Sequence, residues 1–150
     1  MYSNFAINYI MKNFLSSKNA FTMIVLWSVV LFMIAMLGYN FTKGDLSIVP
    51  FIILTLATAM IIWVLLDTRY VIKNNLLLYR SGPFRGRIDI AKIKKIKRHS
   101  GMFVPVSMKP ALDTNGFIIS FNNDDVFVSP KNSAIFLEEI QKVNPKVEIV

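Results

Sequence analysis

Two stretches without a charged residue constrain the fold more than any other feature of this sequence. They cover residues 21–39 and 46–66, which are 19 and 21 residues long. At about 1.5 Å of rise per residue, an α-helix of either length spans the roughly 30 Å of hydrocarbon in a bilayer. The chain is also 54% hydrophobic, whereas soluble domains are usually about 45–50% apolar. The sequence therefore predicts two membrane-spanning helices.

A buried core helix and a cleaved signal sequence are the two alternatives for these stretches. In a chain of 150 residues a core helix would show a polar face, because only a large protein buries a helix on all sides. A signal sequence has an apolar segment of about 7–15 residues that ends in a small-x-small cleavage site. Residues 21–39 are longer, and residues 35–40 approximate such a site only weakly. Membrane spanning explains both stretches better.

The distribution of positive charge predicts the orientation of the two spans. Lys12 and Lys18 precede the first span, the connector at residues 40–45 holds one lysine and one aspartate, and the other fourteen basic residues follow the second span. Because cytoplasmic flanks are rich in Lys and Arg, we expect a two-span protein of the cell membrane with both termini in the cytoplasm. Because the connector has only six residues, we expect the two spans to form a tight hairpin. The spans contain no ionisable residue, so we expect the hairpin to anchor the protein and not to transport ions or protons.

The chain then divides into three parts. Residues 1–20 form a cytoplasmic lead-in, residues 21–66 the transmembrane helical hairpin, and residues 67–150 a cytoplasmic domain. The first ten residues are either an amphiphilic segment or sequence upstream of a start at Met11. The domain carries fourteen basic and eight acidic side chains, a net charge of +6, and is large enough to bury a small core. The chain has no cysteine, which excludes disulfides and cysteine metal sites.

Strand patterns dominate the first half of the domain. Residues 68–72 and 76–80 are apolar, β-branched or aromatic runs, and the Asn74 and Asn75 pair between them tolerates left-handed turn geometry. This pattern predicts a β-hairpin. Extended alternation resumes at residues 85–90, whereas the basic run after it, residues 92–98, fits either a helix or a strand.

The second half of the domain predicts another hairpin and a final helix. Residues 117–121 and 126–128 flank an expected four-residue turn. Ser129 can cap a helix with Pro130 at its first position, and apolar residues recur at helical spacing until Asn144 and a proline end it. We therefore expect an α+β fold with membrane helices, in which strands pack against a C-terminal helix.

The order of motifs along the domain carries a family resemblance. The segments concerned are Tyr70, Val71 and Ile72 before Leu76 and Leu77, then Gly82, Pro83 and Phe84 through Ile88, then Ile90 through Ile96, and finally Val128, Ser129, Pro130 and Lys131 leading to Phe136. This order resembles the YyaB-like bacterial pleckstrin-homology (PH) family of Gram-positive membrane proteins. The resemblance implies a PH-like β-barrel or sheet closed by a C-terminal helix, and it implies no catalytic residue. Related bacterial PH-type membrane proteins include bacteriocin immunity proteins.

Seven basic residues are our candidate surface for anionic lipid or another partner. They are Arg85, Arg87, Lys92, Lys94, Lys95, Lys97 and Arg98. Close to a membrane, each such charge gains about 1 kcal/mol from anionic lipid. The simpler interpretation is a solvated strand face that follows the positive-inside bias, because no lipid-specific pocket can be recognised in the sequence.

A long proline-containing segment, residues 100–116, separates the two halves of the domain. It fits a strand plus a loop of the barrel. If it is exposed, Met102, Phe103, Val104 and Val106 would form an apolar patch suited to a partner or to the bilayer surface.

The sequence predicts no enzyme, cofactor or metal site. His99 is the only histidine, and neighbouring residues of a strand point to opposite faces, so Ser100 does not form a nucleophile–base pair with it. One histidine without cysteines is a poor metal site. The glycine-flanked turn at residues 82–86 lacks the Lys-Ser/Thr ending and the helix of a phosphate-binding loop. No nucleic-acid-binding motif is present either.

Together these patterns predict a non-enzymatic, membrane-anchored PH-like protein. We expect it to recognise a protein or a lipid at the cytoplasmic face of the membrane, where anionic headgroups, another protein and a second copy of the chain are the candidate partners. The alternative is bacteriocin immunity or envelope-stress protection that acts through the membrane hairpin.

Overall fold

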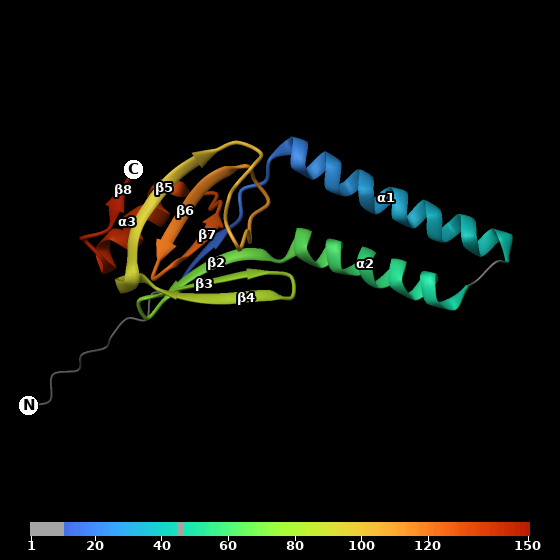
Figure 1. Ribbon diagram of the computed structural model, residues 1–150, viewed down its shortest axis with the longest axis horizontal. Coiled ribbons are helices and arrows are strands. Elements are labelled where there is room, and N and C mark those ends of the chain that lie inside the picture. The colour runs from blue at the N-terminus through green and yellow to red at the C-terminus, as the bar shows by residue number, and fades with distance from the viewer. Residues whose placement is uncertain (1–10, 45–46) are drawn as a thin grey trace, which may run out of the picture.

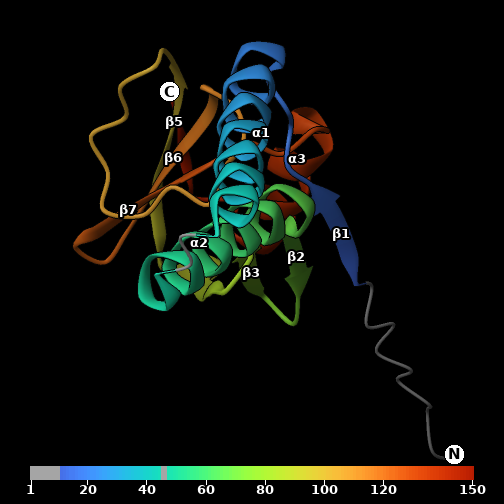
Figure 2. The same ribbon diagram turned by 90° about the vertical axis from the view of Figure 1, so that its right-hand side faces the viewer.

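Two long helices extend from one end of a β-rich domain in the computed structural model, which describes residues 11–44 and 47–150 (Figure 1). Helix α1 covers Ala20–Lys43 and helix α2 covers Ile48–Leu66. Seen from their free end in Figure 2, the helices stand over the domain, with β1–β3 to one side and β5–β7 to the other. The predicted lead-in segment 1–10 lies outside the described residues.

Helix α1 is longer than the predicted first span. It begins after Asn19, whose side chain accepts a hydrogen bond from the Phe21 backbone N–H at 2.9 Å, and it ends at Gly44, which has a left-handed φ of 67°. The prediction of a six-residue connector from residue 40 is therefore wrong. Residues 40–43 contain no proline or glycine, so the helix continues to Gly44, which adopts the left-handed C-cap conformation. Residues 45–46 lie outside the described residues.

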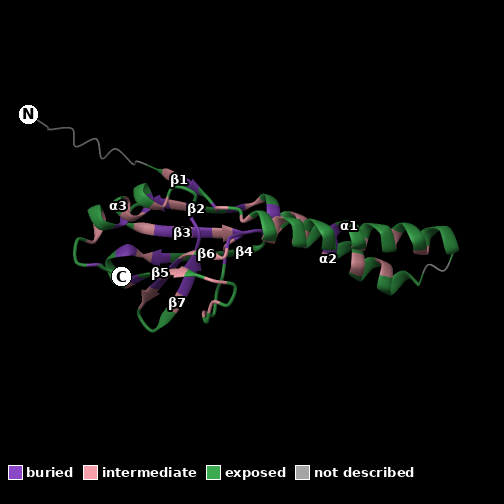
Figure 3. Ribbon diagram, turned by 90° about the horizontal axis from the view of Figure 1, so that it is seen from above, coloured by how far each residue is buried: buried purple, intermediate pink, exposed green. Residues whose placement is uncertain are grey.

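The helices are mostly exposed, as the green colour of their ribbons in Figure 3 shows. Only Val30 of α1 and Thr58 and Leu65 of α2 are buried, and the two helices pack against each other near the domain. Both are long and apolar enough to cross a membrane. The structure therefore provides two candidate membrane spans.

The first sheet contains four antiparallel strands in the order β1-β2-β3-β4. They are β1 (Lys12–Leu15), β2 (Thr68–Lys73), β3 (Leu76–Ser81) and β4 (Phe84–Asp89). The predicted hairpin is confirmed, with Asn74 and Asn75 at φ 52° and 61° in its turn. Strand β1 lies in the predicted lead-in but pairs with β2 and buries Phe14 opposite Tyr70. The lead-in thus supplies an edge strand of the domain.

The second sheet has the order β7-β6-β5-β8. Its strands are β5 (Ile93–Ser100), β6 (Asn115–Phe121), β7 (Asp124–Val128) and β8 (Glu148–Ile149), and β8 is parallel to β5. The ambiguous basic run is therefore mostly strand. The predicted four-residue turn before β7 is wrong, because Asn122 at φ 51° allows a two-residue turn and places both aspartates of β7 in the sheet.

The two sheets do not close into a barrel within the described residues, so the barrel expectation is corrected, whereas the α+β class is supported. A short 3-10 helix, η1 (Ile90–Lys92), separates β4 from β5. The Asp89 carboxylate accepts a hydrogen bond from the Ala91 backbone N–H at 3.1 Å, and Ile90 is fully buried. This capped turn redirects the chain, so that β5 begins a second sheet instead of pairing with β4.

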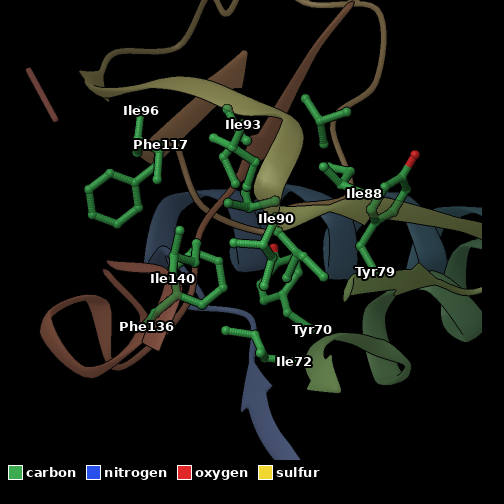
Figure 4. Packing of buried hydrophobic residues seen from close by; sticks show 14 of the residues in the cluster. Tyr70, Ile72, Tyr79, Ile88, Ile90, Ile93, Ile96, Phe117, Phe136 and Ile140 are labelled. Carbon is green, nitrogen blue, oxygen red and sulfur yellow. The ribbon is translucent and has the colours of Figure 1, made fainter. Parts of the chain in front are cut away.

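Helix α3 (Ser133–Val143) closes the core between the sheets. Figure 4 shows Phe136 and Ile140 of α3 in one cluster with Tyr70 and Ile72 of the first sheet. The Phe136 ring meets the Phe14 ring edge-on, with centroids 5.3 Å apart. The predicted end of the helix is confirmed, because it stops before Asn144, whose side chain donates hydrogen bonds to the Ile90 and Ile93 carbonyls.

The predicted start of α3 at Ser129 and Pro130 is wrong, because the N-cap is Asn132. Ser129 is buried in a polar network that connects the sheets. Its backbone N–H donates to the Tyr70 hydroxyl at 3.1 Å, and that hydroxyl donates to the Pro110 carbonyl at 2.6 Å. Burial raises the pKa of Tyr70, so the phenol stays a donor at neutral pH.

Candidate functional site

The seven predicted basic residues are divided between the two sheets. Arg85 and Arg87 lie on β4, Lys92 ends η1, and the other four lie on β5. They therefore do not share one strand face. Arg85 and Arg87 belong to the outer face of the first sheet, opposite to the buried Ile88.

The β5 residues are partly occupied by contacts within the domain. The Lys94 ammonium donates to the Asn122 carbonyl at 3.1 Å, and the Lys95 ammonium lies 3.5 Å from the Glu148 carboxylate. The Arg98 guanidinium stands 5.9 Å from the centre of the Phe117 ring. Lys97 is exposed. Pairs of basic residues follow each of the buried Ile93 and Ile96 along this strand, and most of these basic side chains face solvent.

Three arginines lie side by side on the outer face of the first sheet. Arg69 of β2 is the direct cross-strand partner of Arg80 of β3, and Arg80 is the partner of Arg85 of β4. Directly opposed residues of neighbouring strands have Cβ atoms about 4.5–5.5 Å apart. We call Arg69, Arg80 and Arg85 the arginine row.

Our sequence prediction included Arg85 but missed Arg69 and Arg80. The missing signal was hairpin register. A two-residue turn at Asn74 and Asn75 pairs position 69 with position 80, and the next turn pairs position 80 with position 85. Charge density along the sequence does not reveal this row, because its members are separated by ten residues and by four residues.

Asp67 neutralises part of the arginine row. It follows the last residue of α2, and its carboxylate oxygens lie 3.3 Å from the Arg69 Nε atom and 2.5 Å from the Arg80 Nε atom. Arg85 is exposed and has no carboxylate partner among the described residues. Three guanidinium groups and one carboxylate leave a local charge of about +2.

The arginine row borders a hollow of about 470 Å³ on the outer face of the sheet. The half-buried Val71 and Leu78 contribute an apolar surface to this hollow. Gly86 also lines it, and a Cβ atom at that position would collide with the Tyr79 ring on the inner face. The hollow thus combines an apolar floor with a guanidinium rim.

The turn between β3 and β4 packs against the last turn of α2. The Gly82 backbone N–H donates to the Asp67 carbonyl at 3.2 Å. A Cβ atom at Gly82 would lie 2.8 Å from the Val64 Cγ2 atom, and its φ of 56° also favours glycine. Phe84, at the start of β4, is 50% exposed. The arginine row is therefore held directly below the end of α2.

The segment between β5 and β6 exposes apolar side chains. Met102 and Phe103 are 73% and 83% exposed, whereas Val104 and Val106 are half-buried. The far end of this segment contacts the start of α1, because the Asn19 backbone N–H donates to the Leu112 carbonyl. The predicted patch is thus exposed at its tip only.

A second hollow, of about 340 Å³, contains the only histidine. The His99 ring meets the Phe127 ring edge-on at 6.0 Å, and the Ser100 hydroxyl donates to the Asn115 side chain at 2.7 Å. The Asp113 carboxylate accepts from the Ser17 hydroxyl at 2.7 Å. No group of three metal-ligating side chains occurs among residues 11–44 and 47–150. We therefore interpret these hydrogen bonds as structural contacts between neighbouring segments of the domain.

The comparison with family models now adds to this geometry. A model described as a bacterial PH domain matches residues 68–144, just over half of the chain. The chain belongs to the bacterial PH domain family. The match runs from β2 through α3 and leaves out β1, α1, α2 and β8. Comparisons with curated proteins and with solved structures gave no match.

Membership in the bacterial PH domain family directs attention to recognition. Such domains are typically non-catalytic and often bind lipids or proteins. The predicted PH-like domain is therefore confirmed at the level of the family. The narrower YyaB-like group and a Gram-positive origin stay predictions.

Proposed function

We propose that this bacterial PH domain protein is anchored in the cell membrane by α1 and α2, with both termini in the cytoplasm, and that its domain recognises a lipid or protein partner at the membrane face without enzymatic activity. One observation carries the proposal. Both candidate spans leave the domain at the same end, where the arginine row lies (Figure 1). Helices that cross a bilayer would hold this end against the headgroups.

The uncovered apolar surface of the helices supports membrane anchoring. Soluble monomers rarely expose contiguous apolar patches larger than a few hundred Å², about 300–600 Å² at most. Here Phe32 of α1 and Leu56 of α2 are 66% and 65% exposed, and nearly all of their apolar neighbours are uncovered as well. A core helix of a soluble protein would be mostly buried.

The pairing of β1 argues against the signal-sequence alternative. Strand β1 precedes α1 and pairs with β2, and the Lys12 ammonium reaches the Glu139 carboxylate of α3 at 2.7 Å. Cleavage after α1 would remove this strand from the domain. The residues before α1 thus have a structural role in the domain itself.

Cysteine labelling tests the membrane topology, because the natural chain has no cysteine. Lys43→Cys reports on the tip of the hairpin, and Asn123→Cys reports on the turn between β6 and β7. We expect a membrane-impermeant maleimide to label Lys43→Cys in intact cells and Asn123→Cys only after lysis. Equal labelling of both in intact cells, or release of the protein by alkaline carbonate, would contradict the proposal.

A truncation separates recognition by the domain from immunity or envelope-stress protection through the hairpin. Residues 1–66 keep both candidate spans but lose the bacterial PH domain. We expect partners captured by the full chain from detergent-solubilised cells to be lost from this truncation. Retention of partners, or of protection, by residues 1–66 would favour the alternative.

A further inference from the structure

We propose that the arginine row binds the phosphate of an anionic phospholipid headgroup in the leaflet from which α2 emerges. This inference rests on the proposed function, because it requires α2 to cross the membrane. It goes further by naming the site and the ligand. Arg69, Arg80 and Arg85 form the rim of the site, and the hollow beside them receives the rest of the headgroup.

The arginine row lies close to the end of α2. Arg69 lies three residues after Leu66, the end of α2, so at about 3.3 Å per residue its Cα is within roughly 10 Å of the span. The polar layer of each leaflet is roughly 5–8 Å thick. A guanidinium group at the end of a long side chain can therefore reach the phosphates.

The β3–β4 turn fixes the depth of the other two arginines independently. Gly82 packs on Val64, which lies inside the last turn of α2. The tip of the turn is thus level with the end of the span. The exposed Phe84 ring lies at the same level, at the membrane interface, where aromatic side chains are enriched. Arg80 and Arg85 flank this turn on the side away from the membrane.

The arginine row carries more positive than negative charge. Like charges directly opposed across a sheet are destabilising, and Asp67 neutralises only one of the three arginines. An anion at the row would offset the remaining charge. Arginine is well suited to this role, because its planar fork of N–H donors pairs with phosphate oxygens in a bidentate manner.

The arginine row and the hollow beside it are accessible from outside the domain. The outer face of the first sheet is open, because Arg85 is exposed and the Arg69 side chain is 48% exposed. The hollow of about 470 Å³ is large enough for the glycerol part of a headgroup, and its floor of Val71 and Leu78 is apolar. On β5, by contrast, Lys94, Lys95 and Arg98 have contacts within the domain.

Trp63 provides a natural reporter for the test. It lies in the last turn of α2 and is 45% exposed, and the other tryptophan, Trp27, can be removed as Trp27→Phe. The full chain is reconstituted in mixed vesicles of phosphatidylcholine and phosphatidylglycerol, in which either the phosphatidylglycerol or the phosphatidylcholine is brominated. Quenching of the Trp63 fluorescence then measures how strongly the anionic lipid is preferred over phosphatidylcholine beside the end of α2.

Two variants of equal charge change are compared. One replaces the arginine row (Arg69→Gln, Arg80→Gln and Arg85→Gln), and the matched control removes three charges from β5 (Lys94→Gln, Lys97→Gln and Arg98→Gln). We expect a phosphatidylglycerol preference of about thirtyfold in the parent, because the two uncompensated charges of the row each gain about 1 kcal/mol near an anionic surface. The row variant should lose it, and the control should keep it.

A smaller change guards against a folding defect in the triple variant. Arg85→Gln removes the exposed arginine that has no carboxylate partner in the described residues, and it leaves the Asp67 contacts in place. It should reduce the preference about fivefold, by the same gain per charge, with an unchanged circular dichroism spectrum. An unchanged preference in both row variants, or an equal loss in the β5 control, would overturn the inference.

The source of the phosphate is tested by competition. Excess inorganic phosphate should leave the preference for phosphatidylglycerol unchanged, because a lipid already confined to the leaflet is present at high local concentration. Loss of the preference would instead assign the site to soluble phosphate. If no brominated lipid quenches Trp63, α2 is outside the bilayer and the proposed function fails. If both lipids quench it equally, only the arginine-row inference fails.

Discussion

The two sheets of the bacterial PH domain carry their positive charge in different ways. On the first sheet, three arginines from three strands are brought together by register, directly below the end of α2. On the second sheet, the charges follow one strand, and Lys95, for example, pairs with Glu148. The difference shows that strand register, and not charge density along the sequence, brings the three arginines together.

The sheets nevertheless share one core. Phe136 of α3 contacts the Phe14 and Tyr70 rings of the first sheet and belongs to the same buried cluster as Ile96 and Ile119 of the second. We therefore expect the two sheets to unfold together, even though their surfaces differ.

The largest expected effect tests this shared core. Phe136→Ala should destabilise the protein by about 3–5 kcal/mol, because it removes a fully buried ring and leaves a cavity. Ile135→Ala is the matched control on the same helix, since Ile135 is 47% exposed, and it should cost less than about 0.5 kcal/mol. Urea unfolding in detergent, followed by circular dichroism, measures both. A variant with one sheet folded and the other unfolded would break the comparison.

The next largest expected effect on stability comes from an alanine substitution at one glycine of each sheet. A Cβ atom at Gly116 of β6 would collide with the Val128 backbone carbonyl, whereas one at Gly86 of β4 would meet only the far end of the Tyr79 side chain. Overpacking costs about 1–3 kcal/mol. We expect Gly116→Ala near the upper end and Gly86→Ala near the lower end, because a ring can shift and a sheet backbone cannot. Equal midpoints in urea would refute this difference.

The pH dependence of stability tests the contacts of Asp113, which accepts hydrogen bonds from Ser17, after β1, and from Asn115, at the start of β6. Burial alone would raise the pKa of Asp113, but hydrogen bonds from the Asn115 backbone N–H and the Ser17 hydroxyl hold that pKa below its ordinary value. The carboxylate therefore stabilises the fold above pH of about 4, and this contribution is lost as the pH falls through the lowered pKa.

Asp113→Asn should remove that part of the acid dependence and cost about 1 kcal/mol at neutral pH, the usual value of one hydrogen bond. Thermal unfolding between pH 3 and pH 7, a window of about one unit below to three above the ordinary carboxyl pKa, measures it. Asp124→Asn, on the exposed β6–β7 hairpin, is the control. An acid profile identical to that of the parent would show that Asp113 contributes nothing.

The smallest effect concerns the charges of the second sheet. Lys95→Gln removes the contact with Glu148, whose side chain is 63% exposed. Exposed ion pairs contribute about 0.2–1 kcal/mol, and the 3.5 Å separation suggests the lower end. The unfolding midpoint should hardly change, and less so at high salt. A loss as large as that of Gly116→Ala would show that β5 is as constrained as the first sheet.

Local patterns allowed several parts of the fold to be predicted. The charge-free stretches form helices, the Asn74 and Asn75 turn sets its hairpin, and the helix before Asn144 ends where expected. Each depends on a few adjacent residues. The start of α3 was predicted wrongly because Ser129, a good cap by type, is held by Tyr70 through a contact 59 residues away.

Residues distant in the sequence account for what was missed. Four residues around Phe14 carry too little pattern to indicate a strand, and β1 forms only because β2 offers an edge and α3 a surface for that ring. The barrel failed to close because η1 turns the chain between β4 and β5. Of the arginine row, only Arg85 was predicted, since the row exists only once the strands are paired.

The sequence by itself thus determined the elements whose causes are local: helix length from uninterrupted apolar residues, tight turns from residues that accept positive φ, and strands from alternation. The tertiary structure decided where the charges lie. Strand pairing brings residues far apart in sequence to within about 5 Å, and packing of Gly82 on Val64 sets their depth below α2. The arginine row depends on these distances, which no single segment encodes.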